Sequence, residues 1–318
     1  MIALPFKGKG AMVWTIRKWV DKLPPVGDEV TRLVADALSL GITHLAIKVV
    51  NGLSLRWEPG NPARQNDEYL DELVPALREA GIEPLAWGWT YGRSIYSPYA
   101  DISSQEAALI TGVVSKYGFK AYLIDAEHHY RRKGLGMDKV ATNLASRLRA
   151  GLPDVALALC SYRYPITYQP DFPWASFMPF MDFHAPQVYW EEATSPTAPA
   201  YQLDRSYQEY KQLKQLPYVP VAPLYSPTSG WKPTAQQETN FLDTCIHLGL
   251  DAASIWCIDQ AYQQGILPAL EAWADFAWPG AGQPQPPTSP TAPIEDVVGE
   301  VVAWARGLGY TGPGLESG

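Results

Sequence analysis

Short apolar runs rich in β-branched residues alternate with longer amphipathic stretches along most of the chain. The short runs predict strands, and the longer stretches carry apolar residues at helical spacing and often end in glycine. The predicted strands are 11–16, 43–50, 83–90, 121–127, 155–162, 183–190, 219–225 and 253–259. The predicted helices are 27–41, 66–81, 104–118, 136–151, 173–181, 201–215, 234–249 and 265–277.

Eight successive βα units predict parallel strands joined by right-handed crossovers, and eight such strands close a barrel. We therefore predict the α/β class, with a single (β/α)8 TIM barrel over residues 1–278. A doubly wound open sheet is the alternative. It would place a glycine-rich phosphate-binding turn after the first strand, where this sequence has none.

The composition changes after Trp278. Residues 279–293, "PGAGQPQPPTSPTAP", predict an extended, semi-rigid proline-rich linker. Residues 294–318 contain one short amphipathic helix, which is too small to bury a core alone. We expect this segment to be a docking helix or the start of a further module that tethers the barrel to a larger assembly.

The formal net charge of −8 argues against binding to nucleic acid, which needs clustered cations. The one basic run, 131–133, is expected to be a solvated loop or a contact to an anionic polymer near the acids described below. The 12 Trp and 18 Tyr residues exceed what a core requires and suit flat, amphipathic ligands such as sugars.

Cys160, Cys245 and Cys257 have no metal-like spacing and lie in apolar segments, so we expect buried free thiols. The sequence shows neither a signal-peptide pattern nor an apolar stretch long enough to cross a membrane. We expect a soluble protein without a membrane partner, either cytoplasmic or released by lysis as phage enzymes are.

The segment "YLIDAEHHY", 122–130, ends a predicted buried strand in two carboxylates and two histidines. Because side chains alternate along a strand, Asp125 and Glu127 should share one face. A solvated strand end or a salt bridge is the ordinary explanation of such a pair. At the carboxyl end of the fourth strand of a barrel, however, the pair lies where active sites form, and burial beside a like charge raises a carboxyl pKa.

Other polar and aromatic residues follow the predicted strands and should surround the same barrel mouth. We expect these residues to bind substrate: Lys48, Trp89, Tyr91, His129, Tyr162, Gln187, Tyr189, Tyr225, Trp256 and Asp259. Two carboxylates among aromatic side chains are typical of glycoside hydrolysis. We expect Glu127, taken as the more buried acid, to be the general acid and Asp125 to be its supporting carboxylate.

A metal-dependent hydrolase built on Asp125, Glu127 and His129 is a further alternative. On a strand, His128 would point away from the face that Glu127 and His129 share, so one metal could not easily take both histidines. We expect no metal and no cofactor. A serine nucleophile lacks its Gly-x-Ser-x-Gly elbow, and Cys160 lacks a basic partner.

Four motifs between residues 10 and 278 resemble the glycoside hydrolase family 25 lysozymes, which are N-acetylmuramidases with a short barrel. The motifs are "LAIKVVNG" at 45–52, "LIDAE" at 123–127, "APQVYW" at 185–190 and "SIWCID" at 254–259. The resemblance implies an acidic pair at Asp125 and Glu127, a second-strand motif at Lys48 and Gly52, and a sixth-strand motif at Gln187 and Tyr189.

The related family 18 chitinases also end the fourth strand in Asp-x-Glu, and they use the acetamido group of the substrate as the nucleophile. That resemblance implies roles for Tyr189 and Trp256. Family 25 carries an early Gly-x-Asp, whereas this chain has Met12 there. Either Asp259 or Glu191 supplies that acid, or the chain is a divergent or inactive relative.

The leading hypothesis is a glycosidase that acts on a polysaccharide containing N-acetylhexosamine, either peptidoglycan or a chitin-like polymer. The alternative is a non-catalytic carbohydrate-binding or virion-associated barrel that has lost the chemistry.

Overall fold

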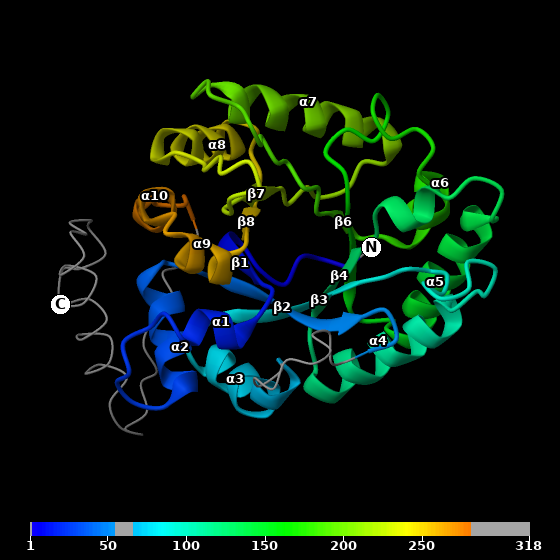
Figure 1. Ribbon diagram of the computed structural model, residues 1–318, viewed down its shortest axis with the longest axis horizontal. Coiled ribbons are helices and arrows are strands. Elements are labelled where there is room, and N and C mark those ends of the chain that lie inside the picture. The colour runs from blue at the N-terminus through cyan, green and yellow to red at the C-terminus, as the bar shows by residue number, and fades with distance from the viewer. Residues whose placement is uncertain (1, 55–65, 281–318) are drawn as a thin grey trace.

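A computed structural model describes residues 2–54 and 66–280 of the chain. Within them, eight parallel strands form one curved sheet with helices around it (Figure 1). The strands are β1 (Gly8–Val13), β2 (His44–Asn51), β3 (Glu83–Trp89), β4 (Ala121–Asp125), β5 (Ala156–Cys160), β6 (Phe183–His184), β7 (Val221–Pro223) and β8 (Ala252–Trp256).

The sheet closes on itself. Its order is β6-β5-β4-β3-β2-β1-β8-β7, and parallel bridges join its two ends at His184 with Tyr218 and at Gln187 with Val221. Across this seam the Val221 N–H donates to the Pro186 carbonyl at 2.9 Å. The predicted α/β class and (β/α)8 barrel are confirmed.

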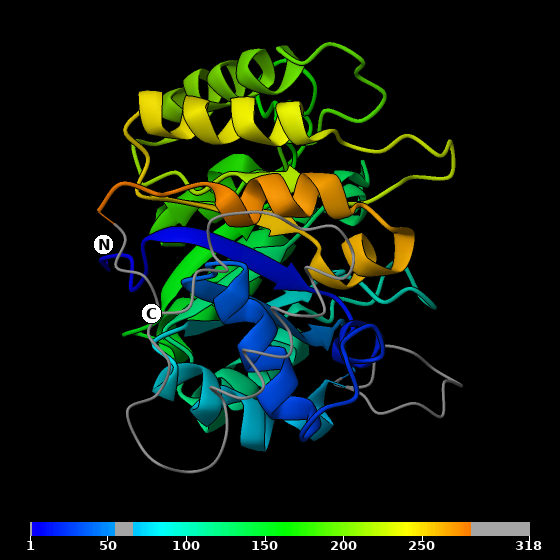
Figure 2. The same ribbon diagram turned by 90° about the vertical axis from the view of Figure 1, so that its left-hand side faces the viewer.

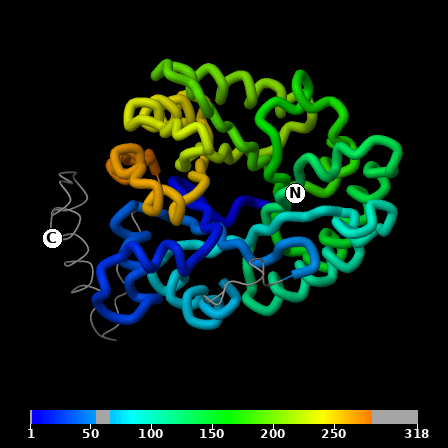
Figure 3. The backbone as a smooth tube through the Cα atoms, in the orientation of Figure 1, coloured from blue at the N-terminus to red at the C-terminus, as the bar shows by residue number. Residues whose placement is uncertain are grey.

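Helices surround the barrel and follow the strands in turn (Figures 1 and 3). They are α1 (Ile16–Val20), α2 (Glu29–Ser39), α3 (Asp67–Glu79), α4 (Ser103–Tyr117), α5 (Met137–Gly151), α6 (Trp174–Phe177), α7 (Ala198–Leu213), α8 (Ala235–His247), α9 (Ile258–Gln264) and α10 (Leu267–Asp275). Two short 3₁₀ helices, His128–Arg131 and Met178–Phe180, interrupt the loops. No helix in the described ranges combines the length and apolarity needed to cross a membrane.

Alternation along the strands separates two apolar layers. In β4, Ala121 and Leu123 belong to the cluster inside the barrel, whereas Tyr122 and Ile124 belong to the cluster between sheet and helices. Small side chains predominate inside, where Trp87 supplies bulk, so the barrel interior is a packed core. The three cysteines are buried free thiols, as expected.

The segment before β1 closes the amino end of the barrel. Phe6 packs there against His44 and Phe183, with ring centroids 4.2 Å and 5.9 Å apart. The Ile2 N–H donates to Asp182 at 2.8 Å. The segment that leads into β1, the blue strand of Figure 2, is thus hydrogen-bonded to Asp182, just before β6.

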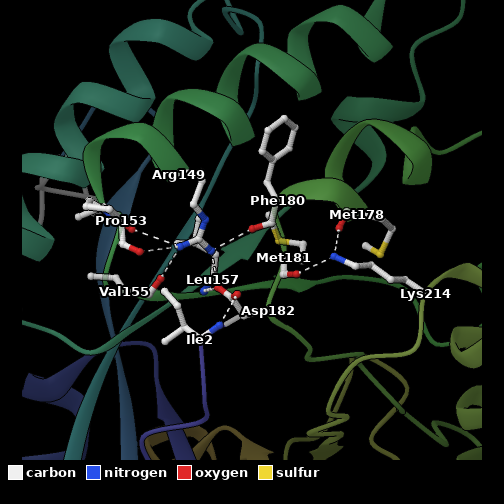
Figure 4. Close-up of polar contacts among 11 residues, drawn as sticks. Ile2, Arg149, Pro153, Val155, Leu157, Met178, Phe180, Met181, Asp182 and Lys214 are labelled. Atoms are coloured by element: carbon white, nitrogen blue, oxygen red, sulfur yellow. Dashed lines mark hydrogen bonds and ion pairs between the residues drawn. The ribbon is translucent and has the colours of Figure 1, made fainter.

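Asp182 and Arg149 form the centre of a polar network at this end (Figure 4). The Arg149 guanidinium pairs with Asp182 and donates to the Phe180 carbonyl at 3.0 Å and the Val155 carbonyl at 3.0 Å. Asp182 also accepts from the Leu157 N–H at 3.1 Å. The network ties α5 and β5 to the start of β6.

Several predicted strands are shorter in the structure. The predicted strand 183–190 is regular only over β6, because Pro186 has no N–H to donate to a ladder. The predicted strand 121–127 ends at Asp125, and the predicted strand 253–259 ends at Trp256, after which the chain enters α9. The predicted proline-rich linker, from residue 281 on, and the predicted segment 294–318 lie outside the described residues.

Candidate active site

The two carboxyls lie together at the carboxyl end of β4. Asp125 is the last residue of the strand and is 4% exposed, and Glu127 stands beyond it, half-buried. Gln187 follows β6 and donates from Nε2 to Glu127 Oε1 at 2.8 Å and to Asp125 Oδ1 at 3.3 Å. One amide thus holds both acids in a single arrangement.

Asp125 is the more buried of the two acids, which corrects the expectation from the sequence. Burial raises the pKa of Asp125 well above its ordinary range, and the negative charge of Glu127 raises it further, while Lys48 opposes the rise. Asp125 therefore keeps its proton to a higher pH than an exposed aspartic acid. It does so because β4 ends at Asp125, so that Glu127 extends into the mouth.

Lys48 lies under the site among tryptophans. Its side chain is 3% exposed, and its Nζ lies 5.0 Å from the ring centre of Trp87 and 5.6 Å from that of Trp14. Trp256 meets Trp87 edge-on with the ring centroids 4.9 Å apart. The ring faces stabilise the buried ammonium, and its charge offsets part of the negative charge above it.

A pocket of about 390 Å³ opens over the acids. Five of the ten residues expected around the mouth line it, and two of them, Tyr189 and Tyr225, meet there with ring centroids 5.6 Å apart. The pocket is lined by Met12, Trp14, Trp89, Asp125, Glu127, Cys160, Gln187, Tyr189, Glu191, Tyr225, Trp256 and Gln260. The arrangement offers two acids on one side and aromatic rings on the others.

A second pocket of about 260 Å³ adjoins the first one. The two pockets share Gln187, Tyr189 and Glu191, and Tyr162 lines only the second. Together they form one cleft along the loops that follow β5 and β6.

His129 lies beside this cleft, on a 3₁₀ helix and not on a continued strand. The predicted alternation beyond Glu127 is therefore wrong, and the His128 and His129 rings lie side by side at 3.8 Å. His129 Nδ1 accepts a hydrogen bond from Trp89 Nε1 at 3.4 Å, and Tyr91 packs 4.7 Å from its ring. Burial and the neighbouring cations lower the pKa of His129 to about 4, so its ring is neutral at pH 7.

Metal ligation is not suggested by these side chains. In residues 2–54 and 66–280, no group of three His, Cys, Asp or Glu side chains is placed to hold an ion. His129 is instead engaged by two aromatic residues.

Comparison with known proteins gives structural neighbours only. No protein-family model matches the sequence, and no curated protein matches it. The Group IV chitinase of Ostrinia furnacalis superposes with a TM-score of 0.58 at 12% identity, over 84% of this chain and 97% of that one. A GH18 chitinase from Pseudoalteromonas aurantia gives 0.56 at 14% identity, over 82% and 99%.

The spore cortex-lytic enzyme SleL of Bacillus megaterium QM B1551 gives a TM-score of 0.53 at 12% identity, over 86% of this chain and 76% of that one. The chain therefore shares the (β/α)8 barrel fold of these proteins. These neighbours support the family 18-like side of the sequence resemblance and not the family 25 side.

The position of Gly52, four residues after Lys48, has no room for a side chain. Gly52 has φ +59°, and a Cβ there would lie 2.6 Å from Cδ2 of Tyr91. The glycine lets Tyr91 approach β2, where Asn51 Nδ2 donates to its hydroxyl at 3.4 Å. Tyr91 is thereby fixed against His129, beside the residues that line the pocket.

Asp259 supports the pocket from behind. It is fully buried on α9 and accepts from the Trp14 N–H at 2.9 Å and the Thr15 N–H at 3.1 Å. Burial raises its pKa to about 6. Its carboxyl is thus engaged by the loop that carries Trp14, a pocket residue that the sequence analysis missed although it directly follows β1.

Met12 and Cys160 make the inner wall of the pocket less polar. Met12 is buried at the position where the family 25 pattern has an acid. Cys160 ends β5 with its Sγ 4.0 Å from Gln187 Nε2, and burial raises the pKa of its thiol well above the ordinary range. The thiol is therefore protonated and a poor nucleophile.

Proposed function

We propose that this chain is a glycoside hydrolase that cleaves a polysaccharide containing N-acetylated hexosamine, with Glu127 as the general acid. The observation that carries the proposal is the pair of acids bridged by Gln187 in an aromatic pocket. The structural neighbours, whose names include chitinases and a spore cortex-lytic enzyme, support the same class of substrate.

The pair holds the proton that the reaction needs. Burial keeps a proton on Asp125, and Glu127 is the carboxyl that extends into the mouth and gives its own proton to the glycosidic oxygen. After Glu127 has protonated the glycosidic oxygen, its new negative charge is met by the Gln187 N–H and the Asp125 proton. Asp125 is therefore the supporting carboxyl.

The closeness of the two acids favours a nucleophile supplied by the substrate. Glycosidases that use a second carboxylate place it ~5–5.5 Å from the acid for retention or ~6.5–9.5 Å for inversion, across the sugar ring. Gln187 Nε2 reaches one oxygen of each acid, at 3.3 Å and 2.8 Å, so Asp125 lies beside Glu127 and on the same side of a bound sugar. The acetamido group of an N-acetylated hexosamine can attack from within the substrate, as substrate-assisted enzymes allow.

The test is release of reducing ends from chitin and from peptidoglycan by the wild type and by Glu127→Gln. Loss of a general acid should lower the rate by ~10²–10⁴-fold while binding persists. Glu79→Gln, the same change on the exposed face of α3, should leave the rate unaltered. Full activity of Glu127→Gln on every glycan that the wild type cleaves would contradict the assignment.

A non-catalytic saccharide-binding barrel is the second candidate. Met12, buried in the pocket wall in place of an acid, favours it. Binding of a chitin or peptidoglycan oligomer by the wild type with no release of reducing ends would support this candidate and exclude the hydrolase.

A further inference from the structure

The second pocket of the cleft differs in character from the pocket of the acids. It is lined by Tyr162, Arg163, Tyr164, Tyr168, Gln169, Gln187, Tyr189 and Glu191. Because Gln187, Tyr189 and Glu191 also line the first pocket, the two pockets adjoin, and a saccharide bound over the acids would reach the second pocket. The second pocket would therefore accommodate the next sugar unit of the same saccharide.

Arg163 is the cation of this second pocket. Its guanidinium lies 5.1 Å from the ring centre of Tyr164, and its carbonyl accepts from Ser206 Oγ at 2.6 Å, which fixes its backbone. In the part of the chain that the structure describes, the guanidinium makes no hydrogen bond and no ion pair. A half-buried guanidinium has five N–H donors in a planar fork, and these remain available to a ligand.

A neighbouring arginine shows the contrast. Arg205 stacks on the same Tyr164 ring at 4.2 Å, but its donors go to Glu209 at 3.3 Å and Thr167 at 2.8 Å. Arg205 thus holds the loop in place, whereas the donors of Arg163 are not used by the protein.

The charges around the second pocket favour an anion beside Arg163. Burial raises the pKa of the Tyr162 hydroxyl in this pocket, and the positive charge of Arg131, on the 3₁₀ helix, opposes that rise, so a second cation lies near Tyr162. Glu191 is the opposing acid of the pocket. Burial raises the pKa of Glu191 and the positive charge of Arg163 opposes that rise, yet the two side chains form no ion pair among the described residues.

We propose that the second pocket is a subsite for a saccharide unit that carries a carboxylate, which Arg163 binds through paired N–H donors. This inference rests on the proposed function and narrows its substrate class. A guanidinium and a carboxylate form two parallel hydrogen bonds, which neutral chitin cannot supply. The muramyl lactyl or peptide carboxylates of peptidoglycan supply them, and so does a hexuronate.

The experiment is calorimetry on the full chain with Glu127→Gln as the background, so that ligands stay whole. The ligands are a muramyl-containing oligosaccharide with a free carboxylate, its carboxamide and a chitin oligosaccharide of equal length. Adding Arg163→Gln should weaken binding of the carboxylate ligand by ~10–100-fold, the range for a hydrogen bond to a charged group. Binding of the carboxamide and of chitin should change by less than threefold.

Arg163→Lys should restore part of the lost affinity, because it keeps the charge without the fork. The matched control is Lys133→Gln, which removes an exposed cation that pairs with Asp171 near the same loop and should leave the ligand preference unchanged. An oligosaccharide with a hexuronate in place of the muramyl unit identifies the source of the carboxylate. Tighter binding of either carboxylate ligand than of chitin supports the subsite.

Equal weakening of all ligands by Arg163→Gln would overturn the proposal, since it would mean that Arg163 only shapes the loop. Equal affinity of the starting protein for the carboxylate ligand and its carboxamide would overturn it as well. These binding results do not depend on turnover. A failure of the proposed function would appear separately, as no release of reducing ends by the wild type.

Discussion

Glu238 is a buried acid that the proposed chemistry does not use. It lies on α8 with no exposed surface, and neither of its carboxyl oxygens has a hydrogen-bond partner among the described residues. Burial raises the pKa of Glu238 well above its ordinary range. The folded protein therefore holds this side chain in its neutral form.

Glu238→Gln should make stability less dependent on pH. The folded state keeps a proton that the unfolded state loses above ~4.3, so wild-type stability falls by up to ~1.4 kcal/mol per pH unit from there to the folded pKa. The variant has no such titration. Urea unfolding at pH 4.5 and pH 8 measures this. The free energy of unfolding of Glu238→Gln, relative to that of the wild type, should be higher at pH 8 than at pH 4.5.

An equal difference between the two proteins at both pH values would contradict this account of Glu238. Glu79→Gln is the control, because the same change on an exposed face of α3 should shift neither midpoint.

The strand pattern predicted that several polar residues would lie together, and the structure places some of them in one pocket. The two-residue period placed Asp125 and Glu127 in one pocket, and the position after β6 placed Gln187 beside them. The order of burial of the two acids was not predictable, because it depends on the residue at which β4 ends. Arg163 was not among the residues predicted to bind substrate, because the sequence does not show which guanidinium groups are bonded within the fold, as that of Arg205 is.

At the scale of elements, the contacts of Arg149 and Asp182 join α5, β5 and β6 at the amino end of the barrel (Figure 4). Asp182→Ala should be the more harmful change, because the Ile2 and Leu157 N–H groups lose this acceptor and the Arg149 guanidinium keeps only backbone carbonyl partners. Breaking one partner of a buried pair costs ~3–5 kcal/mol, and partial exposure of Arg149 places this case toward the lower end. Arg149→Met should cost less, since Asp182 keeps two backbone donors.

Urea unfolding of Asp182→Ala and Arg149→Met shows which of the two variants loses more stability. Lys116→Met, which breaks an exposed pair with Asp71 on the surface, is the control and should leave the midpoint unchanged. The reverse order, with Arg149→Met the less stable, would show that Asp182 is not the centre of the network.

Helices were predicted more accurately than strand ends. The helical spacing and the glycine ends located α2, α3, α4, α5 and α8 to within a few residues. Strand ends depend on pairing with neighbours that are distant in sequence, and prolines reduce that pairing. Pro186 and Pro220 illustrate this, since β6 and β7 are the shortest strands of the barrel.

At the scale of the whole molecule, eight alternating units were enough to predict the barrel, because few other folds close eight parallel strands. The sequence did not indicate how the last gap is closed. That gap, between β6 and β7, is joined by irregular bridges at His184 and Gln187. Its geometry depends on the loops that follow both strands and not on a continuous ladder.

This seam should also be the part of the barrel that opens most readily. Local opening follows the density of hydrogen bonds. Only two isolated bridges join the β6 and β7 segments in the described residues, whereas β2 pairs with β3 along its whole length, with one register shift between Lys48 and Val50. Hydrogen exchange should therefore be faster over 183–190 and 217–225 than over 44–51 and 83–89. Slower exchange at the seam than in β2 would contradict this ranking.

The cleft spans the same seam. Tyr189 follows β6 and Tyr225 follows β7, and both line the pocket of the acids. A saccharide bound between Tyr189 and Tyr225 would contact the segments after both β6 and β7. Bound substrate would therefore stabilise the seam between these two strands. Protection of 183–190 and 217–225 from exchange would then report occupancy of the cleft, even in a variant that cannot cleave.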